Sequence, residues 1–385
     1  MSCKGSQPSG CCAPKAECPP EKTSCCGGQE PKPSAVHDQV KDYYGKRVVT
    51  GDDLQTNVCL MAKTKKPAYI REALAMIHDE VQSKYYGCGL IAPEALPGCS
   101  ILDLGSGAGM DCFVLSKLVG PNGHVTGLDM TDEQASLDVA NKHIAYHMEK
   151  FGYKEPNVNF IKGYIEKMVA AGLKPNSFDI IVSNCVINLC PDKRPVLSDA
   201  YAVLKEGGEL YFSDVYSDKV VPEEIRKNEI LWGECIAGAL YWRELYQYAK
   251  EVGFTEPFLV EASEFSFRDN SWKDMLGQDG YGFLSANYRL FKLPAEAKDC
   301  KSMSATYLGG IQACEEVFAL DYKYKFKKNE ALVVPPHVTA VLMYSRFKNF
   351  FKLEETTEIA KKGCGLPDPF QLARSGDIEL KKGCC

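Results

Sequence analysis

Short apolar runs alternate with amphipathic segments through the middle of the chain. The runs have the length of buried strands, and we predict strands at Ser100–Leu104, Val125–Asp129, Val158–Lys162, Phe178–Ser183 and Glu209–Asp214. Apolar residues at helical spacing lie between them and predict helices at Met110–Val119, Asp132–Phe151 and Arg194–Leu204. Regular alternation of strand and helix predicts an α/β fold with a doubly wound, mostly parallel sheet.

A glycine-rich turn, Gly105 to Gly109, follows the first predicted strand and precedes a helix. Glycines without Cβ atoms let the backbone approach a ligand closely, and the helix N-terminus behind the turn favours negative groups. The spacing is G-x-G-x-G, with Met110 where a dinucleotide site has Gly or Ala, which favours a nucleoside without a pyrophosphate. Asp129 ends the next strand, about 20 residues on, where a carboxylate binds ribose hydroxyls.

The flanks divide the chain into further regions. Residues 1–35 are rich in Pro, Gly, Ser and cysteine and predict a disordered tail. Residues 36–98 have a helical pattern, with one helix expected to start at Pro67 and to continue through Val81, and we expect them to form a lid over the strand ends. The core is predicted to span 99–296, with an insertion near 219–250. Residues 297–385 predict a small C-terminal α+β domain and tail.

Finer expectations concern the end of the core and the C-terminal region. We expect Lys205–Gly208 to be a turn, Leu240–Val252 a helix, and Phe258–Val260 and Tyr288–Leu293 strands joined by a connection at Phe283–Asn287. Further on, alternation predicts strands at Ser304–Leu308 and Asp321–Phe326, followed by a helix at His337–Phe351 and an irregular tail after Glu355.

Composition narrows the function classes. The 385 residues carry a net charge of −6 without a basic block, so we expect no nucleic-acid partner. The N-terminus lacks an apolar leader and no apolar run reaches membrane length, so we expect a cytoplasmic protein without a membrane anchor. Eighteen cysteines in a reducing compartment indicate metal, metalloid or redox chemistry rather than a disulfide framework.

Two cysteines fall on the predicted ligand face. Ligands of a doubly wound sheet bind at the carboxyl ends of its strands, and Cys185 follows the fourth strand directly. Cys235 lies beyond the fifth strand, in a stretch of small residues that suits a closely packed turn. A single cysteine is more often a small buried hydrophobe than a ligand, but two on one face strengthen the case for a thiol site.

Several of these segments together resemble the arsenite methyltransferase family, which depends on S-adenosylmethionine, in its animal and algal branch. The resemblance runs from about Val40 to Phe291 and more loosely to the end. The segments that carry it are Asp53–Asn57 before Cys59, Tyr85–Leu90, Ile101–Gly107, Gly163–Lys167, Ser183–Leu189 and Trp232–Cys235. It implies a class I methyltransferase core, similar to a Rossmann fold.

The resemblance also implies roles for individual residues. Cys88, Cys185 and Cys235 would bind arsenic(III), and Cys59 would be a redox partner. The residues implied around S-adenosylmethionine, together with those of the glycine turn, are Tyr86, Asp103, Gly105, Ser106, Gly107, Asp129, Met130, Gln134, Ile165 and Glu166. We assign no role to Cys99, Cys112 or Cys190. The substrate would be arsenite or its thiol conjugates, and we expect a monomer.

Arsenic chemistry suits such a site. Trivalent arsenic is soft and three-coordinate, so three thiolates leave its lone pair directed at the sulfonium methyl. No general base is needed, because that lone pair carries no proton. Methylation formally oxidises arsenic, and two thiols, for which Cys59 and Cys88 are the candidates, can return the electrons as they form a disulfide. Glutathione or thioredoxin would then act as the thiol reductant.

Three alternatives stay open from the sequence. A methyltransferase for another small molecule shares the glycine motif but gives no reason for thiols at both 185 and 235. A metalloid-sequestering protein would depend on its cysteine-rich tails. A zinc protein is the third, disfavoured because no two C-x₂-C pairs have the required spacing.

Overall fold

The computed structural model describes residues 35–43, 67–85, 89–131, 136–264, 276, 280–358, 360 and 366–375. The cysteine-rich tail expected at 1–35 falls outside this part of the chain, apart from Ala35. So do the predicted site residues Cys59, Tyr86, Cys88 and Gln134.

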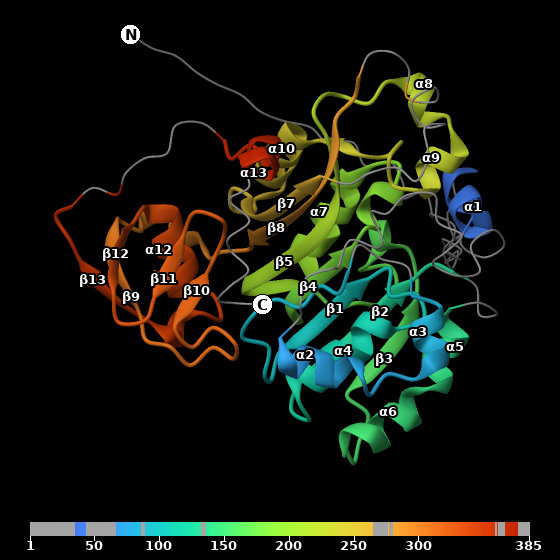
Figure 1. Ribbon diagram of the computed structural model, residues 1–385, viewed down its shortest axis with the longest axis horizontal. Helices are drawn as coiled ribbons and strands as arrows, with labels where there is room; N and C mark the ends of the chain where they lie inside the picture. The colour runs from blue at the N-terminus through green and yellow to red at the C-terminus, as the bar shows by residue number, and fades with distance from the viewer. Residues whose placement is uncertain are drawn as a thin grey trace, which may run out of the picture.

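A central sheet with the order β3-β2-β1-β4-β5-β8-β7 forms the core (Figure 1). Its parallel strands are β1 (Ser100–Leu104), β2 (His124–Asp129), β3 (Val158–Lys162), β4 (Phe178–Asn184) and β5 (Leu204–Ser217), and the short β6 (Leu240–Tyr241) pairs with β5. Two antiparallel strands, β7 (Phe258–Glu264) and β8 (Phe283–Phe291), complete one edge. The predicted α/β, doubly wound, mostly parallel fold is confirmed.

Helices cover both faces of the sheet, because successive strand side chains point to opposite sides. Ile101, Ile180 and Val182 pack with α4 (Met110–Val119), whereas Leu102 and Ile181 pack with α7 (Lys193–Val203) and α10 (Trp242–Val252). On the α4 side lie α2 (Ala68–Leu74), α3 (Asp79–Ser83), α5 (Leu137–Lys142) and α6 (Ile144–Phe151). Beyond the strand ends lie α1 (Ala35–Asp42), α8 (Glu223–Arg226) and α9 (Glu229–Gly233).

The C-terminal region forms a separate small α+β unit beside the core (Figure 1). It contains a three-stranded antiparallel sheet in the order β12-β9-β13 and a hairpin of β10 and β11, with α12 packed against them. The elements are η6 (Ala295–Asp299), β9 (Met303–Tyr307), β10 (Val317–Ala319), β11 (Lys325–Lys327), β12 (Ala331–Val334), α12 (Pro336–Tyr344), η7 (Lys348–Phe350) and β13 (Phe351–Glu355). A last helix, α13 (Pro369–Ser375), returns to β7 of the core.

Several predicted boundaries in the core are wrong. The helix expected at Asp132–Phe151 is two helices that meet at His143, a buried residue whose ring is 2.7 Å from the Glu80 carboxylate. The helix expected to run from Pro67 through Val81 is also two, α2 and α3. Lys205–Gly208 belongs to β5 rather than to a turn, and Phe283–Asn287 belongs to β8. Tertiary pairing overrides local propensity at these places.

Corrections in the C-terminal region have local causes. The strand expected at Asp321–Phe326 starts only at Lys325, because the Asp321 carboxylate accepts hydrogen bonds from the N–H groups of Lys323 (2.8 Å) and Tyr324 and bends the chain. The helix expected to reach Phe351 ends at Tyr344. The tail after Glu355 includes α13, whose first turn is capped by Asp368 through the N–H of Phe370 (2.8 Å).

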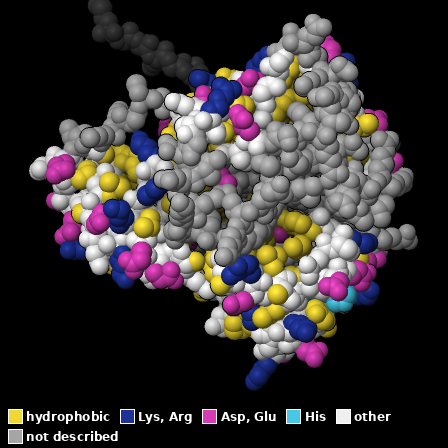
Figure 2. Space-filling model, viewed as in Figure 1, with side chains coloured by type: hydrophobic (Ala, Val, Ile, Leu, Met, Phe, Trp, Pro, Cys, Tyr) yellow, Lys and Arg dark blue, Asp and Glu magenta, His cyan; other side chains and the backbone are white. Residues whose placement is uncertain are grey.

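Charged side chains of both signs lie on the described part of the surface. On the face shown in Figure 2, Lys and Arg side chains are interspersed with Asp and Glu. Within the described residues, every helix is too short or too polar to cross a lipid bilayer.

A buried histidine gives the core a pH dependence. His147 on α6 is stacked on Phe113, with ring centroids 3.7 Å apart. Its Nδ1 lies 2.7 Å from the carbonyl oxygen of His143, and its Nε2 accepts the N–H of His78 at 3.2 Å. This pattern requires the neutral ring with the proton on Nδ1. Burial lowers the pKa of His147 to about 4.

The free energy of unfolding is therefore expected to fall as the pH drops from about 6.5 towards 4. In that window His147 binds a proton in the unfolded chain but stays neutral in the folded protein. The contribution of neutral His147 to the stability of the fold is fully present above that pH range. The urea midpoint of His147→Gln should change less between pH 7 and pH 5 than that of the unchanged chain. His124→Gln, at an exposed histidine, is the control and should follow the unchanged chain. An equal loss in the His147 variant would contradict the assignment.

Candidate active site

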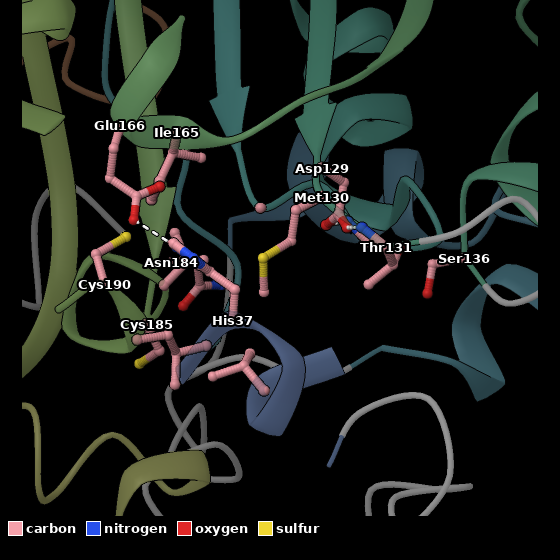
Figure 3. A pocket seen from close by; sticks show the side chains of 15 residues that line it. His37, Asp129, Met130, Thr131, Ser136, Ile165, Glu166, Asn184, Cys185 and Cys190 are labelled. Carbon is pink, nitrogen blue, oxygen red and sulfur yellow. Dashed lines mark hydrogen bonds and ion pairs between the residues drawn. The ribbon is translucent and has the colours of Figure 1, made fainter. Parts of the chain in front are cut away.

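An open cleft of about 890 Å³ lies at the carboxyl ends of β1, β2 and β4. Figure 3 shows side chains from these strand ends, from η4 (Ile165–Lys167) and from α1 around it. The residues that line it are His37, Val40, Gly105, Gly107, Asp129, Met130, Thr131, Ser136, Ile165, Glu166, Asn184, Cys185, Val186, Leu189 and Cys190. This place in the sheet is typical of a small-molecule site.

The glycine turn forms one wall of the cleft. Its backbone packs very close to the side chains of neighbouring segments. Gly105 has φ +72°, and a Cβ on it would lie 2.6 Å from a methyl group of Val186. Gly109 has φ +86°, and its Cβ would lie 2.6 Å from the ring of Phe160. Both positions therefore require glycine, and the backbone of the turn stays open to a ligand.

Asp129 is held beside this turn by two backbone groups. Its Oδ2 accepts the N–H of Gly107 and its Oδ1 accepts the N–H of Thr131, each at 2.8 Å. A carboxylate oxygen accepts two hydrogen bonds, so one site on each oxygen remains for a ligand. Two adjacent hydroxyls, as on a ribose, match this arrangement.

Glu166 lies across the cleft from Asp129 (Figure 3). Its Oε1 is 2.8 Å from Nε2 of His37, which reaches it from α1. Burial alone raises the pKa of the Glu166 carboxyl, but the hydrogen bonds from His37, from its own backbone and from Cys190 lower it below the usual range. The group is thus ionised and ready to accept a hydrogen bond from a ligand.

Cys185 and Cys235 come together beside the cleft. The thiol of Cys235 donates to the carbonyl oxygen of Cys185 at 3.0 Å, and both side chains are buried. Both residues have left-handed backbone conformations, with φ +55° and φ +63°. Such conformations are uncommon outside glycine and asparagine and persist only where the surrounding structure enforces them, which is a frequent feature of functional sites.

A buried polar network holds the two cysteine loops in place. Asn188 donates from Nδ2 to the carbonyl of Val215 (2.6 Å) and its N–H donates to Asp214 (3.0 Å). Trp232 joins the loops through an indole N–H bond to the carbonyl of Leu189 (3.0 Å). A Cβ on Gly238 would lie 1.9 Å from the carbonyl oxygen of Asn188, so the second loop needs glycine there.

Two ionisable side chains next to these loops, Lys193 and Asp214, are also buried. Lys193 donates to the carbonyl of Cys190 at 2.7 Å, and burial lowers its pKa to about 8. Burial raises the pKa of Asp214 to about 7. Because this polar set is enclosed, it fixes the loop geometry more tightly than exposed hydrogen bonds would.

The oxidation state of the thiols differs between the two loops. Cys185 is disulfide-bonded. The six other described cysteines, Cys235 among them, are reduced thiols.

Comparison with known proteins identifies the family. Residues 96–253 match the model of a methyltransferase domain, and residues 300–385 match that of the arsenite methyltransferase C-terminal domain. Over 366 residues the chain is 46% identical to the arsenite methyltransferase of Homo sapiens, covering 91% of this chain and 96% of that protein. The chain belongs to the arsenite methyltransferase family.

The chain is also similar to proteins from organisms other than animals. The chain is 43% identical to the arsenite methyltransferase of Aquipseudomonas alcaligenes, over 91% of this chain and all of that one. It is also similar to the crystal structure of an arsenic(III) S-adenosylmethionine methyltransferase from Chlamydomonas reinhardtii. The TM-score is 0.72 and the identity 40%, over 78% of this chain and all of that one. The methyltransferase core therefore has S-adenosylmethionine as its methyl donor.

Six of the cofactor residues predicted for this arsenite methyltransferase family member line the cleft: Gly105, Gly107, Asp129, Met130, Ile165 and Glu166. Asp103 and Ser106 do not. Asp103 is buried behind the turn, where its Oδ2 accepts the thiol of Cys112 (3.1 Å), and burial raises its pKa well above the usual range. Ser106 is buried beside Gly127 and packs the turn against β2. Tyr86 and Gln134 lie outside the described residues.

Several residues that line the cleft were not predicted from the sequence. His37 and Val40 come from α1, more than 60 positions before the glycine turn, and no local pattern links them to it. Thr131 lies two positions after one predicted strand and Asn184 directly after another, so both could have been found there. Cys190, which had no predicted role, lines the cleft, and burial raises the pKa of its thiol.

Proposed function

We propose that the chain transfers the methyl group of S-adenosylmethionine to trivalent arsenic bound by the thiolates of Cys88, Cys185 and Cys235. The observation that carries the proposal is the pairing of Cys185 and Cys235, two strained and buried cysteines in contact beside the cofactor cleft. Soft sulfur ligands in a preorganised pair suit a soft three-coordinate substrate. The names of the relatives agree with this substrate.

Chain connectivity supports the third thiol. Asn184, the neighbour of Cys185, donates from Nδ2 to the hydroxyl of Tyr85 (3.0 Å) and to the carbonyl of Gly89 (2.7 Å). Tyr85 and Gly89 flank Cys88 in the sequence. One side chain thus holds the two described residues on either side of Cys88 next to the strand end that leads into Cys185.

The protein's part in the reaction is to position the two reactants. The bound cofactor supplies an electrophilic methyl group on a sulfonium. The glycine turn, Asp129 and Glu166 would hold the nucleoside, and the cysteine loops would hold arsenic with its lone pair facing the cleft. Holding two reactants at near-attack distance can contribute roughly 7–11 kcal/mol, and no general base is required.

Thiol redox chemistry would complete the cycle. Methyl transfer formally oxidises arsenic from the trivalent to the pentavalent state. Two thiolates would return two electrons and become a disulfide, with Cys59 and Cys88 as our candidate pair, and a cellular monothiol or dithiol would reduce that disulfide. The presence of Cys185 in a disulfide supports such chemistry in this fold, and its own reduction must precede arsenic binding.

The test is the fate of a labelled methyl group. The full chain would be incubated with methyl-labelled S-adenosylmethionine, arsenite and a thiol reductant, and the products separated with arsenic-specific detection. We expect the label in methylated arsenicals, and only when arsenite and the reductant are both present. Label in another acceptor, with none on arsenic, would leave a methyltransferase for a different small molecule.

A further inference from the structure

Helix α1 contacts both halves of the proposed active site. His37 and Val40 line the cofactor cleft, and Val40 is buried in one apolar cluster with Cys185, Leu189 and Cys235. Figure 3 shows α1 along the edge of the cleft, with His37 directed at Glu166. The helix is therefore part of the wall between the nucleoside residues and the thiols.

The face of α1 that carries His37 and Lys41, four positions apart, contacts the cofactor side. The His37–Glu166 contact of 2.8 Å is largely enclosed, with the side chains 15% and 12% exposed. The His37 ring also packs edge-on against Tyr164, with centroids 4.9 Å apart, and Lys41 donates to the Tyr164 hydroxyl at 3.2 Å. Tyr164 directly precedes η4, so this face of the helix fixes the segment that carries Ile165 and Glu166.

The C-terminal end of α1 contacts the thiol side. The hydroxyl of Tyr43, which directly follows the helix, donates to Glu234 at 2.5 Å in a buried contact. The Tyr43 ring lies so close to Gly233 that a Cβ there would approach it to 2.7 Å. Gly233 and Glu234 lead directly into Cys235, so this contact fixes the backbone that holds Cys235 in its left-handed conformation.

An eight-residue helix is too short to be stable alone in water, so contacts with the rest of the protein must hold α1 in place. Its polar contacts divide between the two half-sites. A ligand that orders one half therefore reduces the entropy cost of ordering the other, which produces positive coupling between the two ligands. Thermodynamic linkage makes that coupling equal in both directions.

We propose that α1 couples cofactor binding to arsenical binding, with His37 and Tyr43 as the positioning residues at its two ends. The inference rests on the proposed function, because it takes Cys235 as part of the arsenic site. Occupation of the nucleoside site stabilises α1 through Glu166 and His37. The stabilised helix then holds the Glu234–Cys235 backbone in its binding conformation through Tyr43.

Calorimetric titration of the full chain tests the coupling. S-adenosylhomocysteine and phenylarsine oxide would each be titrated alone and with the other saturating. A phosphine reductant is preferred, because a dithiol would chelate the arsenical. In the unchanged chain each ligand should tighten the other by the same factor, about 5-fold or more. His37→Leu and Tyr43→Phe should bring the factor close to one.

Matched variants separate coupling from damage to the fold. His37→Gln keeps a donor for Glu166 and should restore the coupling. Gln39→Ala, on the same helix, removes only an exposed contact with Glu229 and should keep it. Tyr43→Phe keeps the ring against Gly233 and removes only the hydroxyl that donates to Glu234, so its melting temperature should fall modestly below that of Gln39→Ala while each ligand still binds when titrated alone.

Two failures are distinguishable. Absence of arsenical binding in the unchanged chain would refute the proposed function. Binding of both ligands without coupling, or an unchanged coupling factor in either His37→Leu or Tyr43→Phe, would refute the role of α1 alone.

Discussion

Cys235→Ser is expected to weaken arsenic(III) binding by at least roughly 100-fold, or ~2.8 kcal/mol, and to abolish arsenic methylation. One of the three soft ligands becomes a hard hydroxyl, and the remaining two thiolates cannot complete the site. The serine hydroxyl still donates to the Cys185 carbonyl, so the loop should keep its conformation. Titration with arsenite under reducing conditions measures the loss, and binding of S-adenosylhomocysteine should change little.

Cys300→Ser is the matched control, because Cys300 is a partly exposed thiol in the C-terminal region. Its arsenite affinity and methylation rate should equal those of the unchanged chain. Unchanged arsenite affinity in Cys235→Ser would contradict the prediction. The arsenic site would then be formed by other cysteines, and the contact between Cys235 and Cys185 would not belong to it.

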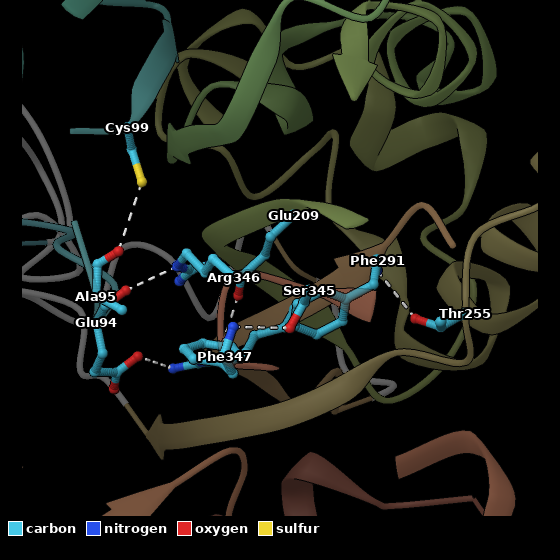
Figure 4. A network of polar contacts seen from close by, with 10 residues as sticks. Glu94, Ala95, Cys99, Glu209, Thr255, Phe291, Ser345, Arg346 and Phe347 are labelled. Atoms are coloured by element: carbon cyan, nitrogen blue, oxygen red, sulfur yellow. Dashed lines mark hydrogen bonds and ion pairs between the residues drawn. The ribbon is translucent and has the colours of Figure 1, made fainter. Parts of the chain in front are cut away.

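Glu209→Gln is expected to destabilise the fold by about 3–5 kcal/mol, because it removes one charge from a buried ionic cluster. Figure 4 shows Glu209 on β5 with Arg346 from the C-terminal region and Glu94 from the segment before β1. Glu209 pairs with Arg346 and lies 3.5 Å from Arg289, which is fully buried and pairs with Glu94. Burial lowers the pKa of Arg289, but Glu94 and Glu209 raise it above the usual range.

Urea denaturation of the full chain measures this effect as a lower midpoint. The control is Arg194→Ala, which breaks an exposed ion pair with Glu251 and should cost about 0–1 kcal/mol. Equal midpoints for the two variants would mean that the buried cluster adds nothing to stability. The cluster joins four segments of the chain, so its loss should also loosen the attachment of the C-terminal region to the core.

Parts of the site were predictable because their signals are local. The glycine turn and Asp129 adjoin strands whose apolar runs are unambiguous, and the carboxyl ends of parallel strands meet at one edge. The same rule placed Cys185 at the cleft. Cys235 could be placed only on the same side, since no periodicity describes the loop in which it lies.

Other features had no local signal. The positive φ values of Cys185 and Cys235 are imposed by packing against Asn188 and its neighbours, and isolated cysteine has no such preference. The division of one apolar pattern into α5 and α6 depends on the contact of His143 with Glu80, 63 positions earlier. Phe283–Asn287 is part of a strand because β5 pairs with it.

By itself the sequence determined the alternating α/β architecture, the glycine turn and the placement of Asp129 and Cys185 at strand ends, because periodicity and residue type act over a few positions. The tertiary structure alone decided that α1 contacts Glu166 and Glu234, that the two cysteine loops touch, and that Glu209 is shared by two arginines. These contacts join residues up to about 190 positions apart, and their geometry depends on the packing of the whole core rather than on any short stretch of chain.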